Sequence, residues 1–146
     1  QHLFVNETGQ YKVWKIDVSA DQVDVRQNSA KARVLLSNLP GYPDNLMRGL
    51  DGKIWLGFAK PRNTIIDQFA DKPFMRALTL RLPRALWPKP QNYGLVLALN
   101  ENGEIIHSLH DTSGTHLRMI TSAKPVGNHL YLGSLNNDRI GKLQIK

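Results

Sequence analysis

The sequence predicts an all-β fold, a partial six-bladed-type β-propeller of about three blades with a short helical lid. Short runs rich in β-branched and aromatic residues recur along the chain, and hairpin-type turns separate them. Similar pairs of predicted strands recur along the chain as an internal repeat. Repeats of about 40–50 residues with four strands are typical of propeller blades. A β-sandwich has many short strands too and is the alternative. The length of 146 residues suggests a single domain, 1–146.

The predicted strands form three groups in chain order. Each group has a first strand with an aromatic residue near its centre and a second strand after it: 3–7 with 11–16, 53–57 with 93–99, and 129–133 with 139–145. A third strand follows in the first two groups, at 32–36 and 104–109. Asp51-Gly52, Asn102-Gly103 and Gly127-Asn128 are hairpin signals. The groups predict an incomplete blade (1–38), a blade with a long insertion (39–112) and a last blade (113–146).

The insertion, at about 61–91, is expected to be helical. Its apolar residues recur at near-helical spacing: Phe69, Phe74, Met75, Leu78 and Leu82. Asp67 and Asp71 lie near its start, where a helix dipole favours acidic residues, and prolines at 83, 88 and 90 stop it. We predict one or two short amphipathic helices that form a lid over one end of the sheets, with their charges solvated. The alternative for the basic residues is a surface that meets anionic lipid.

Composition excludes several classes of protein. The chain is 41% apolar and 21% charged, so it is not a disordered polyelectrolyte. The absence of cysteine excludes disulfides, thiolate nucleophiles and Cys-ligated zinc. No apolar run approaches the roughly 20 residues of a membrane-spanning helix. The net charge is +7, but no aromatic and basic alternation accompanies the basic residues, so nucleic acid is not predicted as a partner.

The number of blades predicts a partner. Propellers typically close with about 4–8 blades, and this chain supplies roughly three. An open arc exposes strand edges and apolar faces, which favour aggregation unless they are covered. We therefore expect either a homo-oligomer, with two copies paired about a twofold axis, or a missing N-terminal propeller half.

Several motifs resemble a known family. Residues 7–15, ETGQYKVWK, are similar to its E-T-G-R-Y-R-V-W-R stretch, and residues 39–45 reproduce its L-P-G-Y-P-D-N. The runs 93–96 and 131–135 follow in the same order. The chain thus resembles the strictosidine synthase-like family, including the adipocyte plasma membrane-associated protein group, within the gluconolactonase and paraoxonase superfamily. The resemblance covers essentially the whole chain and the C-terminal half of a family member.

The resemblance implies a six-bladed propeller with its active site at one end of the central channel, and a periplasmic, secreted or membrane-associated protein. In paraoxonase-like relatives an Asp-Asn pair at the start of an inner strand faces a channel metal, which points to Asp44 and Asn45 as ligands of Ca²⁺. Carboxylate and amide oxygens suit Ca²⁺. Successive strand residues point to opposite faces, so both can bind only if the backbone bends, as Pro43 allows. An Asx turn is the structural alternative.

The resemblance also argues against synthase activity. The synthases use a glutamate within H-F-E-Q-I, and residues 116–120 here read HLRMI, with Arg118 in the glutamate position. Arginine cannot accept a proton near neutral pH. Arg118 could instead bind an acidic group of a small-molecule substrate, or lie exposed at a strand edge. His116 lies at the position where the pocket begins in members of the family, and it is the candidate acid–base residue.

Two functions remain open. The first is a metal-dependent esterase or lactonase, in which a channel metal polarises the carbonyl and activates water. The second is a non-catalytic binding or assembly module that keeps the scaffold without the site, because a fold does not imply a function.

Overall fold

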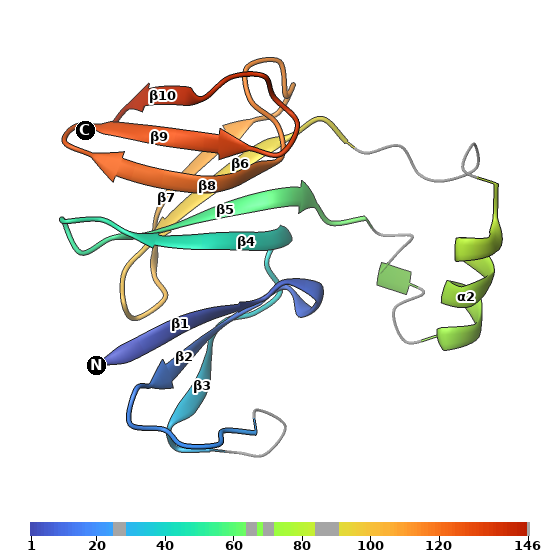
Figure 1. Cartoon of the computed structure of the whole chain (residues 1–146), viewed down its shortest axis with the longest axis horizontal. Coiled ribbons are helices and arrows are strands. Elements are labelled where there is room, and N and C mark those ends of the chain that lie inside the picture. The colour runs from blue at the N-terminus through green and yellow to red at the C-terminus, as the bar shows by residue number, and fades with distance from the viewer. Residues whose placement is uncertain (25–28, 64–66, 69–71, 84–90, 146) are drawn as a thin grey trace.

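The computed structural model describes residues 1–24, 29–63, 67–68, 72–83 and 91–145. These residues form three antiparallel sheets, which follow one another along the molecule (Figure 1). The first sheet has the order β1-β2-β3 and consists of β1 (His2–Glu7), β2 (Lys12–Asp17) and β3 (Ala32–Leu36). A short 3-10 turn, η1 (Thr8–Gln10), joins β1 to β2.

The second sheet has four strands and the third has three. The second has the order β4-β5-β6-β7, with β4 (Gly41–Arg48), β5 (Ile54–Pro61), β6 (Gly94–Leu99) and β7 (Ile105–Asp111). The third has the order β10-β9-β8, with β8 (Ile120–Val126), β9 (His129–Ser134) and β10 (Gly141–Gln144). Each sheet is a meander in which consecutive strands are neighbours, so the predicted all-β, partial-propeller architecture is confirmed.

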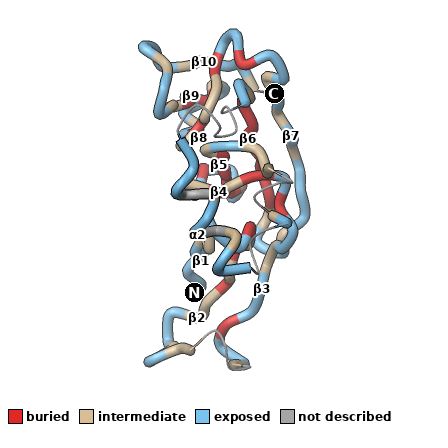
Figure 2. Tube along the Cα trace, turned by 90° about the vertical axis from the view of Figure 1, so that its right-hand side faces the viewer, coloured by how far each residue is buried: buried red, intermediate tan, exposed pale blue. Residues whose placement is uncertain are grey.

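The middle sheet is buried on both faces, because alternate residues of its central strands point to opposite sides. Leu56 and Phe58 of β5 join a core shared with the first sheet, whereas Trp55 joins a core shared with the third. Buried positions therefore run without interruption over 54–58 and 94–99, and they follow the middle of the molecule in Figure 2. Gly57 permits the close packing, since a Cβ there would lie 2.8 Å from the carbonyl oxygen of Ile120.

Two strands, β4 and β8, were not among the β-rich runs that the sequence indicates. Each contains polar residues and a proline, Pro43 or Pro125. Both occupy the edge of their sheet, where a residue that cannot donate a hydrogen bond is tolerated. We call β4 and β8 the inner strands; they begin their sheets and contact each other across the gap between them.

The insertion between β5 and β6 contains the predicted helix. Helix α2 (Pro73–Arg81) stands away from the three sheets (Figure 1). Asp67 fastens the start of the insertion to the first sheet, because the hydroxyl of Tyr11 donates to its Oδ1 at 2.7 Å and Arg62 Nε donates to its Oδ2 at 2.8 Å. Phe69, Asp71 and the prolines at 88 and 90 lie outside the described residues. Within the described part of the chain, no helix is long and apolar enough to cross a bilayer.

Candidate functional site

A β-bulge in β4 contains Asp44 and Asn45. Pro43 pairs with Phe58 and Leu46 pairs with Leu56, so β4 advances by three residues where its partner β5 advances by two. A bulge of this kind bends its strand and re-aims the side chains around the extra residue. The strand therefore has, at Asp44 and Asn45, the backbone bend that two adjacent ligands require.

Side chains on both sides hold the bulge. Thr8 Oγ1 donates to the carbonyl oxygen of Pro43 at 2.8 Å, and Asn6 Nδ2 donates to the carbonyl oxygen of Asp44. On the other side, Asn45 Nδ2 donates to the carbonyl oxygen of Thr121 in β8 at 3.0 Å. The bulge is thus fixed between the first and third sheets before any ligand binds.

The Asp44 carboxylate has no hydrogen-bond or ion-pair partner among the described residues. It is half-buried, and burial raises its pKa above the ordinary value of an aspartate. A partly desolvated carboxylate without a partner costs stability, and such groups are enriched at functional sites. Its environment therefore resembles a binding position more than a structural one.

Two asparagines next to Asp44, one in contact with its backbone and one adjacent in sequence, have amide oxygens without a hydrogen-bond partner among the described residues. The Oδ1 of Asn6 is buried and has no hydrogen-bond partner, although its Nδ2 contacts the backbone of Asp44. The Oδ1 of Asn45 also has no partner among the described residues. These donors have the chemistry that Ca²⁺ prefers, so the residues fit a Ca²⁺ ion. Among the described residues, at Asp44 as elsewhere, no three His, Cys, Asp or Glu side chains gather into a metal-binding group, so the other ligands here would be amide and carbonyl oxygens.

Arg118 lies at the same end of the inner strands. It precedes Thr121, the partner of Asn45, by three residues, and its backbone is fixed because its N–H donates to Asn137 Oδ1 at 3.0 Å. Ser134 Oγ donates to its carbonyl oxygen at 2.6 Å. The side chain is half-buried, and its Nε is buried without a hydrogen-bond partner. A buried donor of this kind is suited to an anionic ligand.

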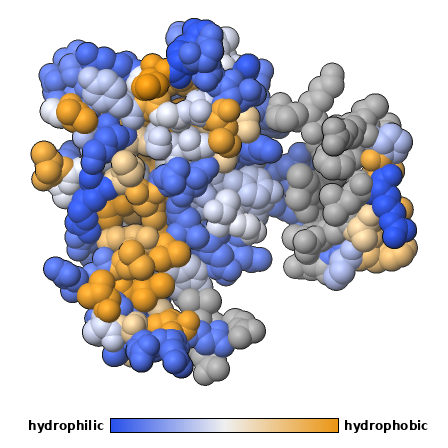
Figure 3. All heavy atoms as spheres, in the orientation of Figure 1, coloured by the Kyte–Doolittle hydropathy of each residue, from blue (hydrophilic) through white to orange (hydrophobic). Residues whose placement is uncertain are grey.

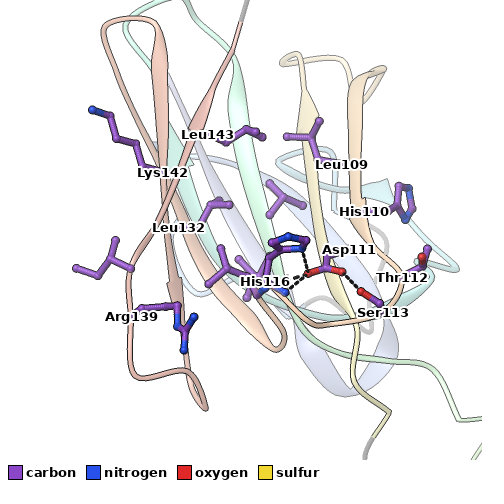
Figure 4. Close-up of a pocket in the computed structure, with 15 residues that line it drawn as sticks. Leu109, His110, Asp111, Thr112, Ser113, His116, Leu132, Arg139, Lys142 and Leu143 are labelled. Atoms are coloured by element: carbon purple, nitrogen blue, oxygen red, sulfur yellow. Dashed lines mark hydrogen bonds and ion pairs between the residues drawn. The ribbon is translucent and has the colours of Figure 1, made fainter.

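His116 lies elsewhere, at the rim of a cleft between the second and third sheets (Figure 4). Its side chain is 91% exposed, and its Nδ1 is 3.6 Å from Asp111 Oδ2. The cleft has a volume of about 620 Å³, and its walls are largely apolar, with Val96, Leu109, Leu117, Ile120 and Leu132 among the lining residues. No contact among the described residues joins His116 to Asp44 or Asn45.

Asp111 organises the loop that carries His116. Its carboxylate accepts hydrogen bonds from the backbone N–H groups of Gly114, His116 and Leu117 at 2.9–3.0 Å and from Ser113 Oγ at 2.8 Å. These donors, led by the Leu117 N–H, hold the pKa of Asp111 far below its ordinary value. Asp111 was not singled out from the sequence, although all four donors follow it within six residues.

Comparison with known proteins supports the family predicted from the motifs. Over 120 residues the chain is 30% identical to the adipocyte plasma membrane-associated protein of Bos taurus, a match that covers 78% of this chain and 29% of the relative. The protein of the same name from Salmo salar is 28% identical over 99% of this chain and 35% of its own length. The chain is a relative of the strictosidine synthase-like proteins.

A plant protein gives a similar match. Protein STRICTOSIDINE SYNTHASE-LIKE 6 of Arabidopsis thaliana is 29% identical over 119 residues, which make up 81% of this chain and 31% of the relative. No family model matches the chain. The chain spans about a third of the length of the curated relatives it matches.

Proposed function

We propose that Asp44 and Asn45 bind Ca²⁺ at the end of the inner strands, as part of the active site of an esterase or lactonase. The unpartnered, partly desolvated carboxylate of Asp44 on a fixed bulge carries this proposal. A cation would relieve the desolvation that raises its pKa, and Ca²⁺ takes six to eight oxygen ligands, which amide groups can supply. Asn6, which the sequence did not single out as a ligand, adds an amide oxygen from β1.

The residues of the candidate site have separate roles in that reaction. A bound cation would supply Lewis acidity toward the substrate carbonyl and toward water. Asp44 and Asn45 would hold it, and Asn6 and Thr8 keep the bulge in place. Arg118 binds an acidic group of a small-molecule substrate through its planar donors. His116 lies at the rim of a separate cleft, so it takes no step in the reaction.

Hydrolysis of an aryl ester and of a lactone, measured with and without Ca²⁺, tests this proposal. We expect Ca²⁺-dependent turnover in the unmodified protein and its loss in Asp44→Ala. Asp21→Ala is the matched control, because Asp21 is an exposed aspartate away from the bulge. Equal turnover with a chelator present, or none with Ca²⁺ in excess, would reject the esterase or lactonase.

Arg118 and His116 can be separated in the same assay. Arg118→Ala should raise KM for substrates that carry a carboxylate, leave KM for neutral esters unchanged, and spare kcat. His116→Asn should leave kcat unchanged, because His116 lies at a separate cleft, beyond the reach of Asp44 and Asn45 that is expected of a general base. A large fall of kcat in His116→Asn would contradict this separation of the two sites.

The open third sheet favours a second candidate, a non-catalytic binding or assembly module. Among the described residues, β10 is the last strand of the third sheet, whereas the second sheet has four strands, and β10 carries an exposed Leu143. Leu3 and Val5 of the edge strand β1 are also exposed, and Figure 3 shows apolar side chains gathered in this part of the molecule. We propose that a second copy or an N-terminal propeller half covers these surfaces.

Light scattering with and without calcium measures this assembly. A discrete dimer supports pairing of two copies, and its loss in Leu143→Asp would place the contact at β10. The exposed Leu50, in the turn between β4 and β5, gives the control Leu50→Asp, which should leave the mass unchanged. A monomer at all concentrations contradicts self-assembly.

A further inference from the structure

We propose that helix α2 docks on an anionic lipid surface, with its apolar face in the membrane interface and its basic residues against lipid phosphates. This inference is independent of the hydrolase site. It concerns helix α2, which projects from the body of the molecule and stands apart from the three sheets (Figure 1).

The helix exposes large apolar side chains along one face. Phe74 is 78% exposed and Leu78 is 46% exposed, and residues four apart lie on the same face of a helix. Leu82, which is 39% exposed, continues this spacing one residue past the end of α2. In Figure 3 apolar spheres lie next to strongly hydrophilic ones on this projecting part. An apolar stripe this exposed on a soluble surface indicates an interaction face.

Basic residues flank this face. Lys72 precedes the helix and Arg81 ends it, and both are exposed. In the sequence, residues 60–89 contain seven Lys and Arg against two Asp, which gives this stretch +5 of the net charge of +7. Asp67 and Arg62 neutralise each other in an ion pair. The described charged side chains next to α2, Lys72 and Arg81, are both positive and exposed.

The positive charge next to α2 indicates which kind of partner its exposed face binds. A second copy of the chain would bring the same positive charge against α2, and like charges repel. An anionic lipid surface attracts each Lys or Arg near it and accepts apolar side chains beside the headgroups. Interfacial helices of this kind lie in the plane of the membrane, with the apolar face about 5–10 Å deep. The nine residues of α2 make such docking weak and reversible.

A dye at a single cysteine tests the docking directly, because the chain contains no cysteine of its own. Leu78→Cys, labelled with a polarity-sensitive fluorophore, is mixed with vesicles of phosphatidylcholine alone or with added phosphatidylserine. We expect a blue shift only with phosphatidylserine. The same label at Leu50→Cys, an exposed position in the turn between β4 and β5, should not shift.

Vesicle cosedimentation measures how much each group contributes. The double variant Phe74→Gln, Leu78→Gln should lower partitioning onto the vesicles more than tenfold. It removes the two apolar side chains whose burial in the membrane interface favours binding. Lys72→Gln with Arg81→Gln should lower it about fivefold for each charge removed. The matched controls are Leu50→Gln with Leu135→Gln for the apolar pair, and Arg33→Gln with Lys124→Gln for the charges; all four residues are exposed.

Three results would overturn the proposal. The first is no blue shift with phosphatidylserine vesicles. The second is a shift that rises with protein concentration without vesicles, which would assign the face to a second copy. The third is an equal loss of partitioning in the control variants, which would show that total charge or hydrophobicity matters and α2 does not.

Discussion

Asp44 and Asp111 belong to the same sheet and have opposite environments. Asp111 ends the outer strand β7, and its carboxylate accepts four hydrogen bonds from the loop after it. Asp44 sits in the bulge of the inner strand β4, and its carboxylate has no partner among the described residues. The pKa of Asp111 is therefore lowered and that of Asp44 is raised.

The difference separates a structural carboxylate from an available one. Hydrogen bonds to a charged group stabilise a fold, whereas a desolvated charge without partners destabilises it unless a ligand compensates. At Asp44, the backbone of the bulge accepts the hydrogen bonds, from Asn6 and Thr8, and the described residues offer the carboxylate no partner. The molecule thus fixes the position of Asp44 without occupying its oxygens. Variants of the two aspartates should differ accordingly.

The largest effect is expected from Asp111→Ala. The substitution leaves three backbone N–H groups and the Ser113 hydroxyl without their acceptor, and hydrogen bonds to charged groups contribute about 1.5–3 kcal/mol each. Because the loop relaxes and water replaces part of the loss, we expect the free energy of unfolding to fall by about 3 kcal/mol. Urea unfolding measures this. A loss no larger than that of Asp21→Ala would show that the network is not structural.

The pH dependence of stability should follow Asp111. A carboxylate with a lowered pKa in the folded state stabilises the fold above its unfolded pKa, about 3.9, and this contribution is lost as pH falls toward the folded value. Asp111→Asn should therefore be less stable at neutral pH and should lose less of its stability below about pH 4. Thermal unfolding across that range measures it, and parallel curves for the two proteins would contradict the assignment.

Thr8→Val should have a smaller effect. It removes the donor to the carbonyl oxygen of Pro43 and keeps the shape of the side chain, so we expect a loss of about 1 kcal/mol in the free energy of unfolding. The bulge should also loosen, so that Ca²⁺ binds more weakly although every oxygen ligand is still present. Isothermal titration calorimetry tests this, with the exposed Thr115→Val as the control. Unchanged calcium affinity would show that Thr8 does not position Asp44.

The smallest effect on stability is expected from Asp44→Asn, and its sign is opposite. The raised pKa means that the folded state binds more protons than the unfolded state just above pH 3.8, so stability falls as pH rises through that window. Removing the charge should therefore raise the melting temperature slightly at neutral pH. The same variant should lose any stabilisation by Ca²⁺. A lowered melting temperature would mean that Asp44 has a partner in the fold.

Much of the fold could be predicted from the sequence, because β5 and β6 are continuous apolar runs and β1, β2 and β9 contain β-rich residues next to turn signals. The inner strands could not be read from this pattern. β4 and β8 face neighbouring inner strands with polar residues and contain proline, so neither alternation nor β-propensity marks them.

The candidate site was predictable only where a motif carries it. Asp44 and Asn45 stand in the family motif, and Pro43 beside them suggested the bend. Asn6 carries no such signal, because its contact with Asp44 joins two sheets across 38 residues of sequence. His116 and Arg118 are two residues apart and were expected to share a pocket, but the chain turns between them and places them beside different surfaces.

Carboxyl ¹³C NMR, with Asp44 and Asp111 titrated against pH with and without Ca²⁺, tests the central claim most directly. We predict that Asp44 titrates above the ordinary range of aspartate and Asp111 below it, and that Ca²⁺ shifts the resonance of Asp44 and lowers its pKa while leaving Asp111 unchanged. An Asp44 that titrates at or below the ordinary value, and does not respond to Ca²⁺, would contradict the account.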